Sequence, residues 1–142
     1  MRRDSSETRR KILTVCVRLF LEQGYKNTSV SQIVDEAGVA RGSYLNLFPT
    51  KDKILLDLTE TMFGGQFGMA RSIADIKLPP VYAYAVETAI QLTLTELNEN
   101  LREIYIEAYS LPETSEYIYL HTTAELKQIF GENFPDDTES DF

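Results

Sequence analysis

A dense run of helix-breaking residues, set in a chain with helical periodicity, constrains the fold more than any other feature. The stretch AGVARGSYLNLFPTK, residues 37–51, holds two glycines and a proline among hydrophobic pairs. Gly38 follows apolar residues at i, i+3, i+4 and i+7, and Pro49 prevents a helix from continuing beyond Phe48. We therefore expect two short helices joined by a tight turn, the second of them about two turns long.

The residues on the N-terminal side of this stretch predict one longer helix and the start of the first short one. Asp4 and Glu7 have the spacing of a capping pair, and the apolar pattern that follows them stops at Gly24. Ser29 and Gln32 repeat the capping spacing at the start of the first short helix. Residues 1–50 should thus form a three-helix head, with a helix-turn-helix motif at about residues 29–48.

The rest of the chain, residues 51–142, predicts a body of longer helices, and the fold class is therefore all-α. The glycine pair at 64–65 should bend or end the first of them, which starts after Thr50. The segment 81–97 is apolar on most sides, which is typical of a helix buried among others. Asn100 should cap the next helix, and the last should run from about residue 112 to Phe130.

Charge is divided unevenly between these two parts. The net charge is −8, yet residues 1–53 carry ten Lys and Arg against six acidic residues, and the remainder carries four against sixteen. Lys and Arg near phosphates release counterions and steer association, so a basic head is typical of a part that meets a polyanion. A mosaic of solvated faces explains the same charges equally well.

Helical spacing divides the second short helix into an inner and an outer face. Tyr44 and Phe48 should face the core together with Val39 and Ile33. The outer face then offers DNA-binding candidates, namely Arg41, Gly42, Ser43 and Asn46. The amide of an Asn can pair with adenine, an Arg can reach guanine or phosphate, a Ser can bond either, and a Gly admits close approach of the backbone. An ordinary helical corner is the alternative.

Two helix starts offer candidates for phosphate contacts. Thr28, Ser29 and Ser31 carry hydroxyls beside the free N–H groups of the first short helix. Lys51 lies in the first turn of the next helix, where a cation opposes the helix dipole but suits a phosphate oxygen. Simple N-capping explains the three hydroxyl residues equally well, and the two roles are compatible.

The ordered set LFLEQGYKNTSVSQIVDEAGVARGSYLNLF, with TRRKIL before it and TKDKIL after it, resembles the tetracycline-repressor-like (TetR) family of transcriptional regulators. The resemblance implies a homeodomain-like DNA-binding head and a helical body that binds a small ligand and dimerises. It also places Leu45 and Leu47 where the family usually has side chains that bond the DNA backbone. Family members are longer, with two further helices at the dimer interface, so we expect this body to be incomplete.

These observations leave two functions open. The first is a regulator that binds a double-stranded DNA operator as a homodimer and is a repressor released by a small-molecule effector. The second is a regulator-like interaction protein that binds a ligand or a partner but binds DNA only weakly. Leu45, Leu47 and the short body motivate the second.

The body also contains candidates for the effector pocket, since most of the tyrosines lie between residues 82 and 119. The candidates are Met62, Phe63, Phe67, Tyr82, Glu87, Tyr105, Tyr109 and Tyr117. Ordinary helical core explains most of these residues as well. Glu87, with Glu103 and Glu107, would favour a cationic ligand, although solvated faces explain the three acids too.

Other classes of protein lack support in the sequence. His121 is the only histidine, and there is no recognisable triad, metal-ligand cluster or phosphate loop, so we expect no enzyme, cofactor or metal. No apolar run is long enough to span a membrane, and no signal peptide is recognisable, so we expect a cytoplasmic protein without a membrane partner. Cys16 lies in a helical pattern between valines and should be a packing residue.

Overall fold

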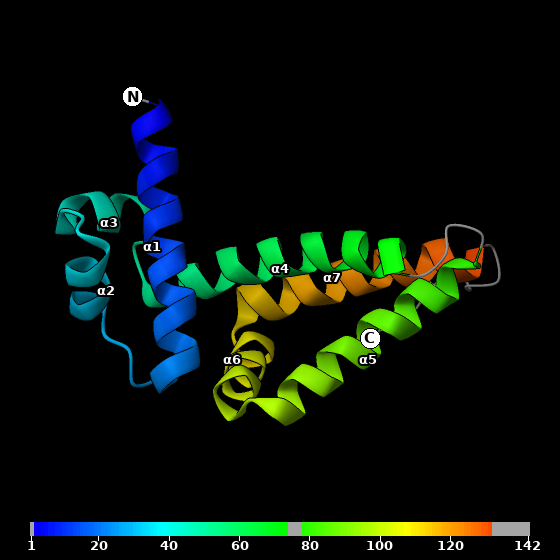
Figure 1. The fold of residues 1–142 in the computed structure, drawn as a ribbon. Coiled ribbons are helices and arrows are strands. Elements are labelled where there is room, and N and C mark those ends of the chain that lie inside the picture. The colour runs from blue at the N-terminus through cyan, green and yellow to red at the C-terminus, as the bar shows by residue number, and fades with distance from the viewer. Residues whose placement is uncertain (1, 74–77, 132–142) are drawn as a thin grey trace, which may run out of the picture.

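The structure is a computed structural model that describes the backbone of residues 2–73 and 78–131 and the side chains of residues 5–62, 78–79 and 81–131. Over these residues the chain is all-α, as predicted, and Figure 1 shows how its helices are arranged. They are α1 (Arg2–Gln23), α2 (Val30–Ala37), α3 (Arg41–Leu47), α4 (Lys51–Ile73), α5 (Pro80–Leu97), α6 (Glu99–Ser110) and α7 (Pro112–Phe130).

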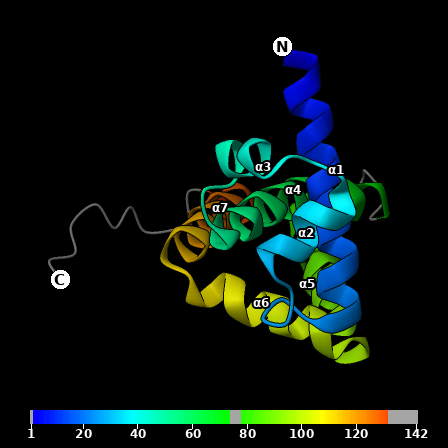
Figure 2. The same cartoon turned by 90° about the vertical axis from the view of Figure 1, so that its left-hand side faces the viewer.

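The head is formed by α1, α2 and α3, with α2 and α3 both packed against α1 (Figures 1 and 2). Its core confirms the predicted inner face of α3, because Tyr44 and Phe48 are buried and their ring centroids lie 6.0 Å apart. Ile33 is fully buried beside them, and Val39 packs against the same cluster. Cys16 is buried there as well, and burial raises the pKa of its thiol to about 12, as befits a packing residue.

The turn between α2 and α3 is made as predicted. Gly38 has a φ of 62° and ψ of 36°, the left-handed conformation that favours glycine. Its N–H donates to the carbonyl of Asp35, and the N–H of Val39 donates to the carbonyl of Val34. These bonds satisfy the last carbonyls of α2 and direct the chain into α3.

Two predicted helix starts were wrong. Helix α1 begins at Arg2, so Asp4 lies within it. Helix α6 is capped by Asn98, whose side-chain oxygen accepts from the N–H of Leu101 at 2.9 Å. Asn100 already lies inside α6, where its Nδ2 donates to the carbonyl of Leu21 at 2.8 Å and fastens α6 to α1.

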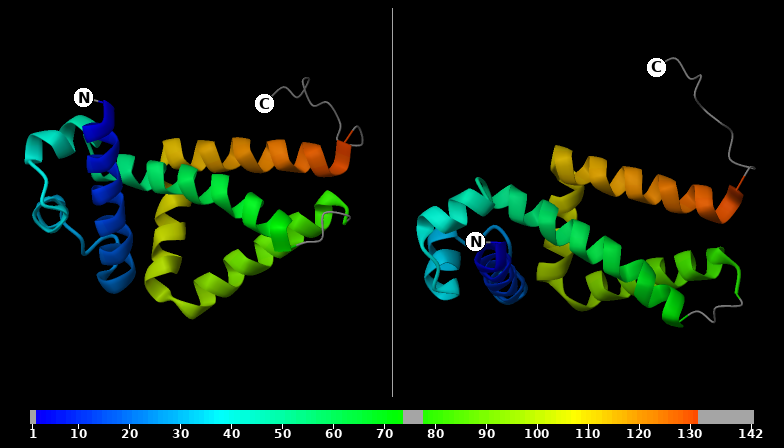
Figure 3. Two further views of the ribbon diagram at one scale, coloured as in Figure 1. Left: turned by 45° about the horizontal axis from the view of Figure 1, so that its top comes forward. Right: turned by 90° about the horizontal axis from the view of Figure 1, so that it is seen from above.

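Helix α4 joins the head to the body, and it continues through the glycine pair at 64–65 to Ile73. Of the two predicted outcomes, the end is therefore wrong, whereas the bend stays a prediction. Helix α4 as a whole contacts α5 and α7, and such contacts offset a cost of about 1 kcal/mol per glycine. Figures 1 and 3 show α7 alongside α4, while α5 meets α4 near the end that is farther from the head.

Helix α5 is less buried than its apolar sequence predicts. Only Ala83 and Glu87 are buried among its described side chains. Leu92 and Leu97 are 62% and 78% exposed, because α4, α6 and α7 cover only part of the helix. None of the described helices has the length and apolar character needed to cross a membrane.

Candidate nucleic-acid interface

Helix α3 lies at the end of the head that is farther from the body (Figure 1). The residues predicted for the outer face of this helix are all exposed, and so is Leu45. The exposed residues are Arg41, Gly42, Ser43, Leu45 and Asn46. Because Tyr44 and Phe48 anchor the opposite side of the helix, this face is held in a defined orientation.

The start of α2 adjoins this face. Arg41 Nη1 donates to Ser31 Oγ at 3.3 Å, so the two exposed residues lie together across the turn. Ser29 is also exposed and caps α2, since its Oγ accepts from the N–H of Gln32 at 3.1 Å. The capping role is thus confirmed for Ser29, and its position at the helix start leaves it available to a phosphate.

Gly42 has no packing reason to be a glycine. A Cβ added at this position would have no other atom within 4 Å. A glycine within a helix costs about 1 kcal/mol relative to alanine, so the small residue is unfavourable for the fold alone. Its exposed position in the first turn of α3 is compatible with close approach by an outside partner.

Thr28 does not belong to this face, although it was predicted as a contact residue. Its side chain is buried, and its Oγ1 donates to the carbonyl of Gly24 at 2.8 Å. Gln23 Nε2 donates to the same hydroxyl at 3.2 Å. The Thr28 hydroxyl therefore stabilises residues 24–29, the connector between α1 and α2.

Lys51 points into the head. Its Nζ donates to the carbonyls of Tyr25 and Thr28 at 2.6 and 3.1 Å and lies 4.0 Å from the centroid of the Tyr25 ring. Partial burial lowers the pKa of Lys51. Because two of its three N–H donors hold the connector, the predicted phosphate contact is not part of the interface proposed below.

The two leucines have different roles. Leu45 is 43% exposed, whereas Leu47 is partly buried and packs against the core cluster. Of the two leucines that the resemblance placed at DNA-backbone positions, only Leu45 therefore points outward.

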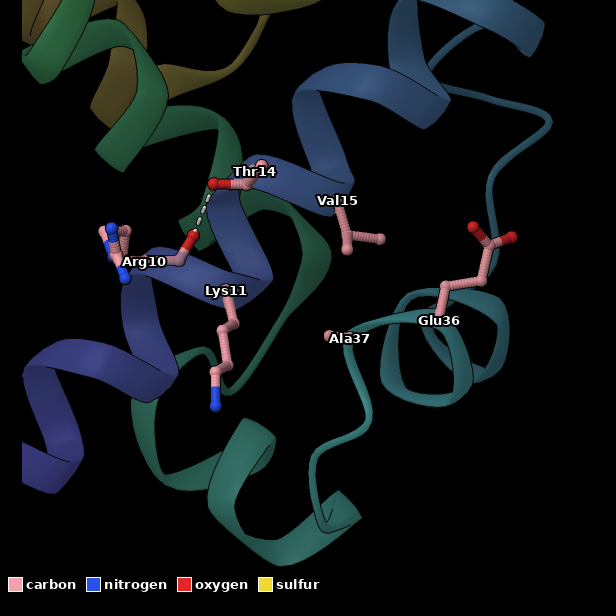
Figure 4. A pocket seen from close by; sticks show the side chains of 6 residues that line it. All are labelled: Arg10, Lys11, Thr14, Val15, Glu36 and Ala37. Atoms are coloured by element: carbon pink, nitrogen blue, oxygen red, sulfur yellow. Dashed lines mark hydrogen bonds between the residues drawn. The ribbon is translucent and has the colours of Figure 1, made fainter.

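Sequence reasoning missed two basic residues of α1. Arg10 and Lys11 line a hollow of about 450 Å³ between α1 and α2, together with Val15 and Ala37. Figure 4 shows the Lys11 side chain extending from α1 toward α3. Both residues are exposed, so they add positive charge beside the α3 face. Their position in the basic first segment of the chain was the available signal.

The candidates for an effector pocket are only partly brought together. Burial raises the pKa of Tyr109, and the charges of Tyr105, Tyr84 and Glu87 act on Tyr109 in the same direction. Tyr82 is 51% exposed, and Tyr117 instead stacks on His121 at 5.8 Å between centroids. Met62 is half-buried, and the side chains of Phe63 and Phe67 lie outside the described residues.

Glu103 and Glu107, the other acids considered for a cationic ligand, face the head. Glu107 Oε1 lies 2.9 Å from Lys26 Nζ. Glu103 lies beside Gly24, and both acids help to line a hollow of about 370 Å³ with Lys26 and Arg102. This junction links the body to the end of α1.

Comparison with known proteins identifies the head. Residues 12–58 match the family described as "Bacterial regulatory proteins, tetR family". The chain is 28% identical over 116 residues to the uncharacterized HTH-type transcriptional regulator YuxN of Bacillus subtilis (strain 168), a match covering 78% of this chain and 38% of that protein. It is 37% identical over 59 residues to the HTH-type transcriptional regulator AcrR of Shigella flexneri, covering 42% and 27%. The matches thus span well under half of either relative.

The fold of the whole described chain has a counterpart among solved structures. A crystal structure titled "gamma-butyrolactone receptor (ArpA like protein)" aligns with a TM-score of 0.56 and 22% identity, covering 89% of this chain and 67% of that one. A family of regulators also agrees with the expectation that the chain is not an enzyme. The helix-turn-helix head of this chain, over residues 12–58, is thus similar to the tetR family of bacterial regulatory proteins, and the helical body shares the fold of the solved structure.

Proposed function

We propose that this chain is a transcriptional regulator whose head binds double-stranded operator DNA with α3 in the major groove. The observation that carries the proposal is the outward face of α3, which lies within the matched segment and holds Arg41, Ser43 and Asn46 exposed around Gly42. A helix fits the major groove, where Asn can read adenine and Arg can read guanine. Leu45 can make an apolar contact with a thymine methyl group.

Phosphate contacts would position this face. Ser29 and Ser31 lie at the start of α2, and Arg10 and Lys11 lie on α1 beside it. Residues 1–53 carry an excess of basic over acidic residues, so the field of the head favours a polyanion while the body repels it. These contacts would supply affinity, and the side chains of α3 would supply sequence preference.

Truncation of the two base-reading candidates tests the proposal. A preferred sequence is first selected from random double-stranded DNA, and binding is then titrated for Arg41→Ala and Asn46→Ala. Each variant should lose about 1 to 3 kcal/mol of binding free energy on the preferred sequence and discriminate less against other sequences.

The control is Arg102→Ala, which removes the same charge from an exposed position in the body. It should bind like the wild type. If the two head variants also bind like the wild type, α3 is not the recognition helix. Absence of salt-sensitive binding by the wild type would instead favour the alternative function, an interaction protein that binds DNA weakly.

Gly42→Ala should separate stability from DNA binding. The added Cβ meets open space, so the variant should be more stable to urea by about 0.5 to 1 kcal/mol. Its affinity for DNA should fall, because the methyl group stands where the α3 backbone would approach the groove. Unchanged DNA affinity together with the gain in stability would place Gly42 outside the interface.

The regulatory part of the proposal concerns α4. A homodimer must hold two recognition helices about 34 Å apart to reach successive major grooves. Helix α4 contacts both the head and the other helices of the body, so an effector in the body that favours one position of α4 would change that separation and release a repressor. That the structural neighbour is titled a receptor supports a ligand-binding body.

Self-association is expected from the exposed apolar side chains of the body. They include Leu92, Leu97, Ile106, Tyr109, Tyr119 and Leu120, each more than half exposed. Extended apolar patches are uncommon on soluble monomers, so this chain should form a homodimer or larger species at micromolar concentration. Sedimentation equilibrium measures this directly, and a well-behaved monomer over the whole concentration range would contradict it.

A further inference from the structure

Two adjacent residues at the start of α4 hold one tyrosine of the head at three places. Lys51 Nζ donates to the backbone carbonyl of Tyr25 at 2.6 Å and lies 4.0 Å from the centroid of its ring. The Tyr25 hydroxyl donates to Asp52 Oδ1 at 2.7 Å. Tyr25 is buried, and hydrogen bonds with a charged partner are about twice as strong as neutral ones. We call these three residues the Tyr25 clamp.

The Tyr25 clamp extends to the start of α2. Lys51 Nζ also donates to the carbonyl of Thr28 at 3.1 Å. Thr28 directly precedes Ser29, which caps α2, so the position of the Thr28 carbonyl determines where α2 begins. Ser29 and Ser31, which would contact phosphates, therefore have positions that depend on the ammonium group of Lys51.

The local fold of the connector does not require a lysine at position 51. The turn already has its own bond, because the N–H of Thr28 donates to the carbonyl of Tyr25 at 3.3 Å. A cation in the first turn of α4 also opposes the helix dipole. What the lysine adds is a charge-assisted link from α4 to two carbonyls of the connector. To contact a phosphate instead, the ammonium would have to leave both carbonyls.

We propose that the Tyr25 clamp positions the start of α2 for DNA, and that Lys51 serves DNA binding as a positioning residue that does not itself contact DNA. The inference rests on the proposed function, in which the head binds DNA through α3 and the start of α2. Loss of the ammonium should therefore weaken DNA binding without removing a lysine–phosphate contact.

The salt dependence of binding separates positioning from direct contact. Lys51→Met keeps a long apolar side chain and removes the ammonium. Affinity for the sequence selected from random DNA is measured by fluorescence anisotropy over a salt series, at a temperature where circular dichroism shows that the variant is folded. Affinity should fall about tenfold, while the slope of log K against log salt concentration should change by well under one.

A second variant tests the same clamp by a milder change. Tyr25→Phe removes only the hydroxyl bond to Asp52, and it should weaken DNA binding by about threefold with the same salt slope. It keeps the inference testable if Lys51→Met does not fold. Unchanged affinity of the folded variants would mean that the clamp serves stability alone, and this result would overturn the inference.

Two lysine variants are the matched controls. Lys11→Met removes a lysine proposed to contact a phosphate, so it should reduce the salt slope by about one. Lys53→Met removes a lysine from the same turn of α4 that pairs with Glu113 of the body, and it should bind DNA like the wild type. A slope reduced by about one for Lys51→Met as well would show a direct phosphate contact and would also overturn the inference.

A double-mutant cycle with Ser31→Ala tests the route through α2. Ser31 is exposed and does not cap the helix. If Lys51 acts by positioning the start of α2, the double variant should lose less affinity than the product of the two single losses. Losses that multiply would overturn the inference alone, provided that the wild type binds DNA in a salt-sensitive way. Absence of such binding by the wild type defeats the proposed function instead.

Discussion

Replacing Glu87 with glutamine should make the protein more stable at pH 8 while leaving its stability near pH 5 almost unchanged. Burial and the charge of Glu125 raise the pKa of Glu87 from its ordinary value of 4.5 to about 7. The folded state therefore holds the proton more tightly than the unfolded state. The contribution of Glu87 to the free energy of unfolding is therefore fully present below about pH 4.5, and it is lost as the pH rises through about 7.

Above pH 7 the wild type has lost about 1 to 3 kcal/mol of unfolding free energy in this way. The glutamine variant does not lose this stability, because its side chain does not ionise. Urea unfolding at pH 5 and pH 8 measures the difference between variant and wild type at each pH. Glu96→Gln, at an exposed position on the same helix, should show the same small difference at both. A Glu87→Gln effect that does not depend on pH would mean that Glu87 is ionised throughout.

Gly24→Ala should destabilise the protein by about 1 to 3 kcal/mol. Gly24 ends α1 with a φ of 92°, which an L residue with a Cβ rarely adopts. The new Cβ would also stand 2.6 Å from Glu103 Oε2 and 3.4 Å from Asn100 Oδ1, both on α6. Moving the flexible Glu103 relieves one contact, but the backbone strain is unavoidable.

Urea or thermal unfolding measures this effect, and Gly42→Ala supplies the matched control. The same substitution at Gly42 meets open space within a helix and should raise stability. Opposite signs for the two variants are therefore the expected result. A neutral Gly24→Ala would show that the connector adopts another conformation in solution. Since Asn100 also bonds the carbonyl of Leu21, a destabilised variant should loosen the contact between α6 and the head.

The sequence by itself determined the local features of the head. The turn at Gly38, the cap at Ser29 and the inner face formed by Tyr44 and Phe48 were all predictable. Each depends on residues within about one helical turn of each other, where backbone conformation and side-chain spacing are read directly from the chain. The outward face of α3 follows from the same spacing, so most of the candidate DNA-binding residues were found without a structure.

Only the tertiary structure decided how distant segments use their polar groups. Asn98 caps α6, whereas Asn100 lies inside the helix and bonds the end of α1. Lys51 turns inward because the carbonyls of Tyr25 and Thr28 accept from it. Glu87 looked like a residue of a solvated face until the packing of α5, α6 and α7 buried it. Hydrogen bonding and desolvation act between groups that are close in space, and closeness between residues far apart in the chain is settled only when the helices pack.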